Sequence, residues 1–516
     1  MKQSIVGGQI NGALIAGSIR YWRVWSAMDT ASYLTADDAV VLWPTSGTFR
    51  RFKVKMYSAL AVGESLTFTL YVNGATTATC TITEGQSTGE DLVHEVAVSP
   101  GDDVCIIADG TGATIGYSYA WWSIEFEGSI ANESVVITGT TTSTLNTTYA
   151  NLASNWSTFS IVEDRLSICP TAGTFKKMYV RQKAAAGVPG DAYQYCLRQD
   201  AGGGLADTSL YVPVVAPAVE GSDTSHSVVV APGQPLTVSC TPAGIVGPPG
   251  ADTQAVISMV FVADVDGESL LFGGPDDLLG KTFGNKYWIY PSCDGDSEFY
   301  QGTDPFSYSK SQTLGEEVVL KKWYVQLSAG PGDGRTFTFT MHDFDADADT
   351  TLVVSIAGAS TTGNDTTHEP TIPAMDRIVI KQESGVFEPA SALAYWGLVQ
   401  YRVPSSSAPV ITSATPDQAR RNQTKNIVLA GSNFTGATDV DFGANISVNY
   451  FSIDSDAQIT ASITINILAA LGARDVDVTG PGGIGTLTGG FTVLDVALGS
   501  GDGSYFARRA ARWGIL

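Results

Sequence analysis

Three histidines follow an aspartate at the same spacing in three distant parts of the chain. The motif is Gly-x-Asp-x-x-His, and it ends at His94, His226 and His368. An Asp–His pair is a common device of acid–base catalysis, because the carboxylate orients the imidazole. An enzyme rarely needs one pair in three tandem copies, whereas a hairpin turn needs the same side-chain bond in every copy. We therefore predict that the aspartates accept backbone N–H bonds at turns and that none of these residues is catalytic. The three aspartates are Asp91, Asp223 and Asp365.

Acidic residues alternate along one short segment: Asp343, Asp345, Asp347 and Asp349. Oxygen ligands at such spacing resemble a calcium loop, but an EF-hand needs Gly at its sixth position and an acid at its twelfth. Ala348 and Val354 stand there. The sequence favours a solvated acidic hairpin over an incidental calcium site, and we expect no cofactor.

A third candidate site is a group of aromatic residues in a loop-rich stretch: Tyr287, Trp288, Tyr290 and Tyr300. Exposed aromatic rings can form a glycan-contact face. Core packing or contact with a neighbouring subunit is the favoured interpretation of such a group, and a glycan-contact face is the alternative.

Other catalytic patterns are absent from the sequence. It contains no Gly-x-Ser-x-Gly, phosphate-binding loop or dinucleotide fingerprint in a suitable setting. Carboxylate pairs for glycoside hydrolysis are defined by distance in space and leave no sequence mark. The net charge of −23 disfavours nucleic acids and anionic membranes as partners. We therefore predict a protein that is not an enzyme.

The elements that carry these residues form an internal repeat. Pro44–Val54 reads PTSGTFRRFKV, Pro170–Val180 reads PTAGTFKKMYV, and Val319–Val325 is a fainter copy, VLKKWYV. The period of about 130 to 140 residues is that of a small domain. Short alternating segments joined by Gly, Pro, Asn and Asp predict antiparallel strands. We predict an all-β chain with three jelly-roll-like sandwiches at 26–128, 132–267 and 270–403, preceded by an N-terminal arm or first strand at 1–25.

The six cysteines do not form a disulfide framework, and none belongs to a C-x-x-C pair. We expect buried free thiols, with Cys80 and Cys105 as the one pair that could form a bridge. Cys169 stands where the first repeat has Trp43, so it is expected to fill the core.

A different module follows the polar segment Pro404–Pro409. Five blocks occur in order, among them Ile427-x-Leu429-x-Gly431-Ser432-Asn433-Phe434 and Asp475-Val476-x-Val478-x-x-Pro481-Gly482-Gly483. They resemble the IPT/TIG family, which implies an immunoglobulin-like sandwich over 408–495. Two segments depart from the family pattern: Arg420-Arg421-Asn422 replaces a Gly-rich turn, and Leu468-Ala469-Ala470-Leu471 replaces a Pro-led loop.

The final stretch, 499–516, combines positive charge with apolar side chains. We interpret it either as a frayed terminus or as a docking peptide for a partner subunit. The docking residues would be Arg508, Arg509, Arg512, Trp513, Ile515 and Leu516.

The repeated units resemble sandwich domains of tailed-phage decoration and appendage proteins, through Trp43–Thr48 (WPTSGT) and Pro100-Gly101-Asp102. The resemblance implies a structural protein on the virion surface, as a head decoration or a fibre or collar appendage. Its partners would be capsid or tail subunits, and a homo-oligomer such as a trimer is implied by resemblance only. The alternative is a glycan-binding adhesin or receptor-binding protein. No signal peptide or membrane segment is expected.

Overall fold

The structure of the protein is a computed structural model. It describes residues 2–14, 18–24, 36–113, 117–130, 132–140, 147–152, 166–244, 254–274, 279, 286–289, 291, 300–301, 312–385, 389–402, 408–434, 437–455, 457–480 and 483–496.

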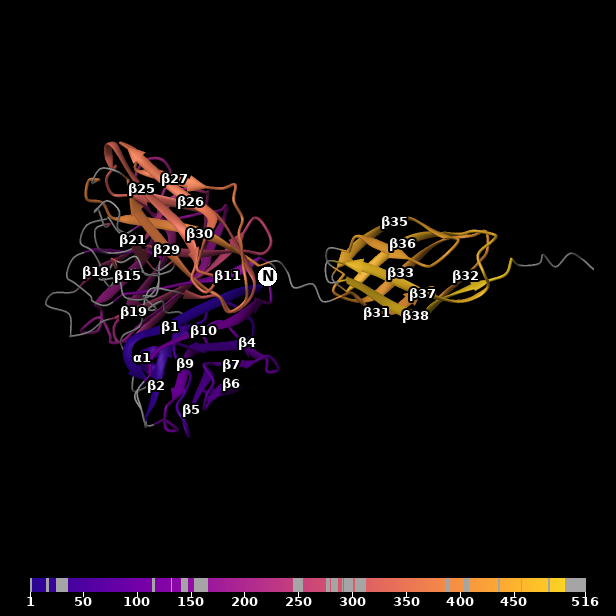
Figure 1. Cartoon of the computed structure of the whole chain (residues 1–516), viewed down its shortest axis with the longest axis horizontal. Helices are drawn as coiled ribbons and strands as arrows, with labels where there is room; N and C mark the ends of the chain where they lie inside the picture. Colours follow the sequence, from indigo (N-terminus) through magenta and orange to yellow (C-terminus); the bar gives the residue numbers. More distant parts are fainter. Residues whose placement is uncertain are drawn as a thin grey trace, which may run out of the picture. The chain divides into compact units, whose positions relative to one another are not determined.

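Most of the described residues belong to β-strands and the rest mainly to the turns and loops between them, so the predicted all-β fold class is confirmed (Figure 1). One helical turn, α1 (Ala36–Ala39), is present among them. No helix in this part of the chain is long and apolar enough to cross a membrane. The chain divides into two compact units, Met1–Val403 and Pro404–Leu516, called here the N-terminal and C-terminal units.

The first sandwich of the N-terminal unit consists of β1 (Lys2–Leu14), β2 (Ile19–Arg23), β3 (Val41–Leu42), β4 (Gly47–Met56), β5 (Ser65–Val72), β6 (Ala75–Thr83), β7 (Thr88–Asp91), β8 (Val96–Val98), β9 (Asp103–Asp109) and β10 (Tyr117–Gly128). One sheet has the order β1-β10-β4-β7 and the other β2-β9-β5-β6. The segment 1–25 therefore supplies the first two strands of this sandwich, ahead of the predicted start at 26.

The second sandwich consists of β11 (Glu133–Thr140), β12 (Thr148–Ala150), β13 (Ser167–Ile168), β14 (Gly173–Gln182), β15 (Ala192–Asp200), β16 (Leu205–Val215), β17 (Glu220–Val230), β18 (Pro235–Ala243) and β19 (Ala255–Ala263). Its sheets are β11-β19-β14-β17 and β12-β18-β15-β16.

The third sandwich consists of β20 (Glu268–Gly273), β21 (Lys286–Ile289), β22 (Tyr300–Gln301), β23 (Gln312–Thr313), β24 (Val318–Leu327), β25 (Gly332–Asp343), β26 (Ala348–Gly358), β27 (Thr362–Asp365), β28 (Thr371–Ile372), β29 (Arg377–Ser384) and β30 (Ala394–Tyr401). Its sheets are β20-β30-β24-β27 and β22-β21-β29-β25-β26.

The three sandwiches share one topology. Numbered within each sandwich, the eight main strands pair as 1-8-3-6 in one sheet and 2-7-4-5 in the other, which is the strand order of a jelly roll. Alternating side chains fill the space between the sheets, as in the first sandwich, where Trp43 packs edge-on against Phe49 and Phe126 at ring-centroid distances of 4.7 and 5.0 Å. All three rings are buried, so they fix how the sheets pack.

The C-terminal unit is a separate sandwich. Its strands are β31 (Val410–Thr415), β32 (Gln418–Arg420), β33 (Thr424–Ser432), β34 (Asp439–Asp441), β35 (Ile446–Ser455), β36 (Gln458–Ile465), β37 (Gly472–Gly480) and β38 (Gly483–Leu494). They form the sheets β31-β33-β36-β35 and β32-β38-β37-β34. Phe442 and Phe491 meet edge-on in a core of their own.

The five described cysteines are buried free thiols, so Cys80 and Cys105 do not form the bridge that was considered. Cys169 is fully buried and its N–H donates to Gln234 O, as Trp43 N–H donates to Asp102 O. It fills the core at the position of that tryptophan, as predicted.

Residues 404–516 expressed alone are expected to fold, because their core does not draw on the N-terminal unit. We expect a single cooperative urea transition with a slope of about 1 to 1.5 kcal/mol per molar urea. It should coincide with one component of the full chain's unfolding curve, followed by circular dichroism. A non-cooperative curve for the isolated segment would contradict this division.

Candidate functional site

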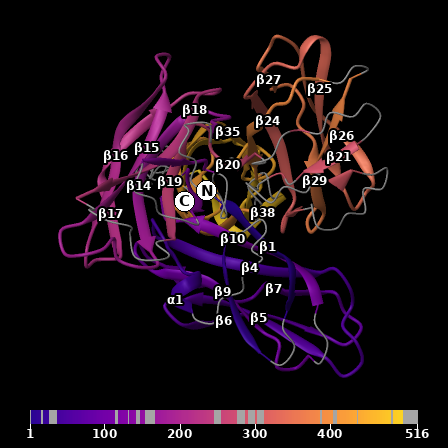
Figure 2. The ribbon, with the colours of Figure 1, turned by 90° about the vertical axis from the view of Figure 1, so that its left-hand side faces the viewer.

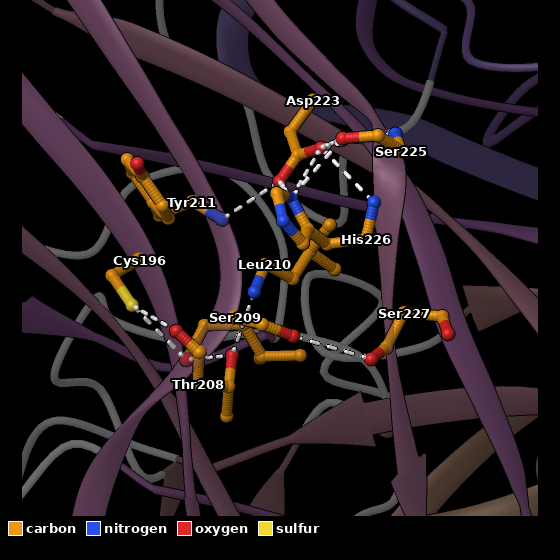
Figure 3. Close-up of polar contacts among 10 residues, drawn as sticks. Cys196, Thr208, Ser209, Leu210, Tyr211, Asp223, Ser225, His226 and Ser227 are labelled. Atoms are coloured by element: carbon orange, nitrogen blue, oxygen red, sulfur yellow. Dashed lines mark hydrogen bonds and ion pairs between the residues drawn. The ribbon is translucent and has the colours of Figure 1, made fainter.

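Asp223 forms a hydrogen-bonded corner with the residues around it (Figure 3). Its Oδ1 accepts the backbone N–H groups of Ser225 (3.1 Å) and His226 (3.2 Å), and its Oδ2 accepts the N–H of Tyr211 (3.3 Å). His226 Nδ1 lies 2.9 Å from Oδ2. Tyr211 belongs to β16 in one sheet and Asp223 to β17 in the other, so the carboxylate links the two sheets.

The other two copies repeat this geometry. Asp91 accepts the N–H groups of Val93, His94 and Thr79, and Asp365 accepts those of Thr367, His368 and Val353, at 2.9 to 3.2 Å. In each copy the Nδ1 of the histidine lies 2.9 Å from the carboxylate. The predicted turn bonds are therefore present in all three copies.

The corner bonds keep the aspartates ionised. Burial alone would raise the pKa of Asp365, but N–H groups from Val353, Thr367 and His368 outweigh it and lower that pKa to about 2. The pKa values of Asp91 and Asp223 are also lowered, because similar bonds outweigh burial. The bonds to backbone groups therefore give each aspartate a structural role, which is to hold the turn and link the two sheets.

The acidic segment 343–349 forms the predicted hairpin between β25 and β26, and two of its exposed aspartates are also ion-paired. Asp345 accepts bonds from Arg377 and, at 3.0 Å, from Lys55 of the first sandwich. Asp349 pairs with Lys381 and with His342. Asp343 is buried, whereas Asp345, Asp347 and Asp349 are exposed. The four carboxylates thus meet different partners, and the described residues contain no group of three or more that could hold a metal ion.

The proposed glycan-contact residues include two that are buried. Tyr287 is 6% exposed and Trp288 is 2% exposed, and Trp288 packs edge-on against His342. The two residues are consecutive on β21, so their rings lie on opposite faces of the sheet, and Trp288 is covered by Phe344 and Val379. Neither buried ring is placed to contact a sugar. Tyr290 and the side chain of Tyr300 lie outside the described residues.

The proposed docking residues also lie outside the described part of the chain. They are Arg508, Arg509, Arg512, Trp513, Ile515 and Leu516.

A further set of repeated contacts lies between the sandwiches, which surround a common centre (Figure 2). Strand β3 of the first sandwich packs on β14 and β19 of the second, β13 of the second packs on β24 and β30 of the third, and β23 of the third packs on β1 and β10 of the first. The strand that packs on the neighbour is the equivalent one in each case, although the third contact uses β1 where the others use β14 and β24, and the ring closes within one chain.

A fully buried glutamate lies at each of the first two interfaces. Glu133 of the second sandwich accepts a bond from Thr45 of the first and pairs with Lys176 (2.8 Å) and Lys177 (3.0 Å). Burial opposes ionisation of this carboxyl, but the bonds from Lys176, Thr45 and Lys177 outweigh it and lower its pKa. A charge without solvent is stable only when it is paired and hydrogen-bonded, as here.

The second interface repeats this arrangement one sandwich further along. Glu268 accepts a bond from Thr171 at 2.6 Å and pairs with Lys321 (3.1 Å) and Lys322 (2.6 Å). Its pKa is lowered too, because these bonds outweigh its burial.

The third interface closes the ring with its acids at other positions. Glu316 stands where the other copies have Thr45 and Thr171, and it pairs with Arg51 (3.3 Å) and Lys53 (2.8 Å) of the first sandwich. Arg402 at the end of the third sandwich pairs with the buried Glu125. On β1 the register position of Glu133 and Glu268 belongs to a lysine, Lys2.

A β-bulge aims one basic side chain at each interface. Arg51, Lys177 and Lys322 have φ angles of 52°, 53° and 53°, and each lies where two residues oppose one on the neighbouring strand. Glycine adopts this left-handed conformation without a steric penalty, whereas other residues incur about 1 kcal/mol. A basic residue occupies each of these three positions even though its backbone conformation favours glycine.

Neighbouring sandwiches also approach each other closely at each interface. A Cβ on Gly397 would lie 1.9 Å from Ile168 O, and one on Gly315 would lie 2.0 Å from Ser123 Oγ. At the first interface Ser258 Oγ instead donates to Leu42 O. Ser123, Ser258 and Gly397 are equivalent positions, and each closely approaches the neighbouring sandwich, at Gly315, Leu42 and Ile168 respectively.

No protein-family model matches the chain, and a search of curated proteins finds no relative of it.

Replacing Asp365 by Asn should remove a pH-dependent part of the stability. A carboxyl whose pKa falls from about 4 to about 2 on folding contributes about 2 kcal/mol above pH 4, and this contribution is lost as the pH falls towards 2. Urea unfolding should show the variant less stable at pH 6, with the difference from the parent largely gone near pH 2. Asp333→Asn, at an exposed position of the same sandwich, should change stability by less than about 0.5 kcal/mol at both pH values. An Asp365→Asn difference that does not vary with pH would contradict the corner's role.

Lys177 allows the charge and backbone effects to be separated. Lys177→Met should cost about 1 to 3 kcal/mol, because Glu133 loses one of its two ammonium partners. Lys177→Gly should be about 1 kcal/mol more stable than Lys177→Ala, since only glycine fits a φ of 53° without strain. Both differences would be measured by urea unfolding.

Thr224, exposed on β17, provides the control, since there the order should reverse and Ala should exceed Gly by about 0.5 to 1 kcal/mol. The same Ala–Gly order at both positions would contradict the bulge argument.

Proposed function

We propose that the chain is a non-enzymatic structural protein on the surface of a tailed-phage particle, as a head decoration or a fibre or collar appendage. The observation that carries the proposal is the ring itself. Three sandwiches of one strand order are joined through buried ion pairs, and their repeated Asp–His corners serve to tie the sheets together. Such a unit is suited to a mechanical role.

Sequence features support the same proposal. The WPTSGT segment at Trp43–Thr48 and the Pro100-Gly101-Asp102 turn resemble those of tailed-phage sandwich domains. A unit resembling IPT/TIG domains follows the ring. The net charge of −23 keeps an abundant surface protein soluble at high local concentration.

The ring also bears on the oligomeric state. Contacts that a trimer of single sandwiches would make between chains are made here within one chain. We propose that one chain occupies a docking site that three copies of a smaller protein would otherwise fill. A homo-oligomer is then not required. Light scattering should give a mass near 54.2 kDa for the purified protein. A mass near three times this value would support the trimer implied by resemblance instead.

Particles purified from cells that produce the phage and the tagged chain should carry the protein. Deleting 499–516 is expected to reduce incorporation at least tenfold, while unfolding of residues 1–403 stays unchanged. The amount would be measured by quantitative immunoblot on gradient-purified particles. Absence of the full chain from particles would refute the proposed function. Full incorporation after the deletion would refute only docking through the tail.

A further inference from the structure

Both departures from the IPT/TIG pattern lie at one end of the C-terminal unit. Strand β31 starts beside the end of β33, where Val410 pairs with Ser432, so the chain enters at that end. The opposite end, called here the exit pole, comprises residues 416–425, 466–474 and 493–496. The strand pairing places these segments together, because the start of β33 pairs with the end of β36 at Thr424 and Thr464, and the start of β37 pairs with the end of β38 at Gly472 and Val493.

The two departures contact one another directly. Arg421 Nε donates to Ala469 O at 2.6 Å, and Arg474 Nη2 donates to Ala470 O at 2.7 Å. Asn466 adds two bonds, since its Oδ1 accepts the N–H of Leu468 and its backbone O accepts that of Ala469. The loop 466–471 is thus held in one conformation by its neighbours.

This fixed loop presents aliphatic side chains to solvent. Ile467 is 50% exposed, Leu468 is 74% exposed and Leu471 is 50% exposed, whereas Ala469 between them is fully buried and anchors the loop. Large apolar side chains held rigidly on a surface are typical of binding sites, because little conformational entropy is lost on binding.

The charge around the loop indicates the chemistry of the occupant. Every described basic residue of the C-terminal unit lies at the exit pole: Arg420, Arg421, Lys425 and Arg474. Two acidic residues, Asp417 and Asp495, share the pole, and Asp495 pairs with Arg421. The chain as a whole carries −23, so this local excess of cations is unusual for it. An apolar centre with a basic rim matches an apolar groove bordered by carboxylates.

We propose that the exit pole, centred on Ile467, Leu468 and Leu471, is a docking surface for a partner protein with an acidic rim around an apolar groove. The chain's own last segment is a poor occupant, because Arg508, Arg509 and Arg512 would repel the basic rim. The inference rests on the proposed function, and names the surface through which the chain docks.

Peptide selection tests the surface without knowing the partner. A displayed library of random 12-residue peptides would be selected on the immobilised full chain and counter-selected on the Ile467→Ser/Leu468→Ser/Leu471→Ser chain. Enriched peptides should combine Asp or Glu with large apolar residues. They should bind the triple variant at least tenfold more weakly, and bind the parent more weakly at 500 mM than at 50 mM salt. Peptides that bind both chains equally, or that lack acidic residues, would overturn the proposal.

Two substitutions at the opposite end provide the matched control. Val410→Ser/Ile484→Ser changes residues that are 51% and 62% exposed, and should leave peptide binding unchanged. Thermal unfolding of both variants would verify that the C-terminal unit stays folded.

Particle incorporation separates this inference from the proposed function. If the parent chain is on particles and the triple variant is reduced at least tenfold, both stand. If the triple variant incorporates fully, the docking surface is wrong and the proposed function stands. If the parent chain is absent from particles, the proposed function is wrong, and the peptide selection decides the chemistry of the surface. Heparin, a polyanion, provides a further comparison. If the parent and the triple variant bind heparin equally well, and the parent binds it as tightly as it binds the selected peptides, the pole would be assigned to anionic polymers instead.

Discussion

The N-terminal unit depends on one constraint: carboxylates lie between its sandwiches, where water does not reach them. Glu133 and Glu268 are fully buried, and an isolated carboxylate in such a place would be strongly destabilising. Each is stable only because two lysines and a threonine converge on it. Since the threonine comes from the neighbouring sandwich, ionisation of the glutamate and association of the sandwiches are coupled. The ring and its charges therefore form together.

The bulge explains how two basic side chains can reach one carboxylate. Consecutive residues of a strand normally point to opposite faces of the sheet. The left-handed residue at Lys177 breaks this alternation, so that Lys176 and Lys177 both contact Glu133. The double basic residue in the repeated motif, which reads Arg-Arg, Lys-Lys and Lys-Lys in the three copies, thus has a geometric cause.

Much of the fold could be predicted because local patterns determine it. The strand Ser65–Val72 alternates polar and apolar residues and is followed by an Asn-Gly turn, and the structure has those bounds. The corners were also predictable, since the Asp-x-x-His bonds are local. The first strand was harder to predict, because Lys2–Leu14 pairs with Tyr117–Gly128 at the other end of the sandwich. Its Gly-rich sequence gives little alternation.

The features of the candidate sites that could not be predicted from the sequence depend on contacts between residues that are distant in the chain. Nothing near Asp345 signals that Arg377 and Lys55 will neutralise it, because all three are distant in the chain. For Trp288 the sequence favoured packing over a glycan-contact face but did not identify its neighbours, which are Phe344, Val379 and His342. The repeated basic pair was visible in the sequence, but its acidic partners stand at different positions in the third interface, which hides the pattern.

The covalent joining of the three sandwiches has an evolutionary consequence. In an assembly of identical subunits every mutation appears at all symmetry-related places at once. Here a change in one copy alters one interface only, as Glu316 in place of a threonine illustrates. The contacts between sandwiches can therefore keep the same type of ion pair while the outer surface of each sandwich changes independently. One gene can thus specify three unlike surfaces on a single symmetric frame.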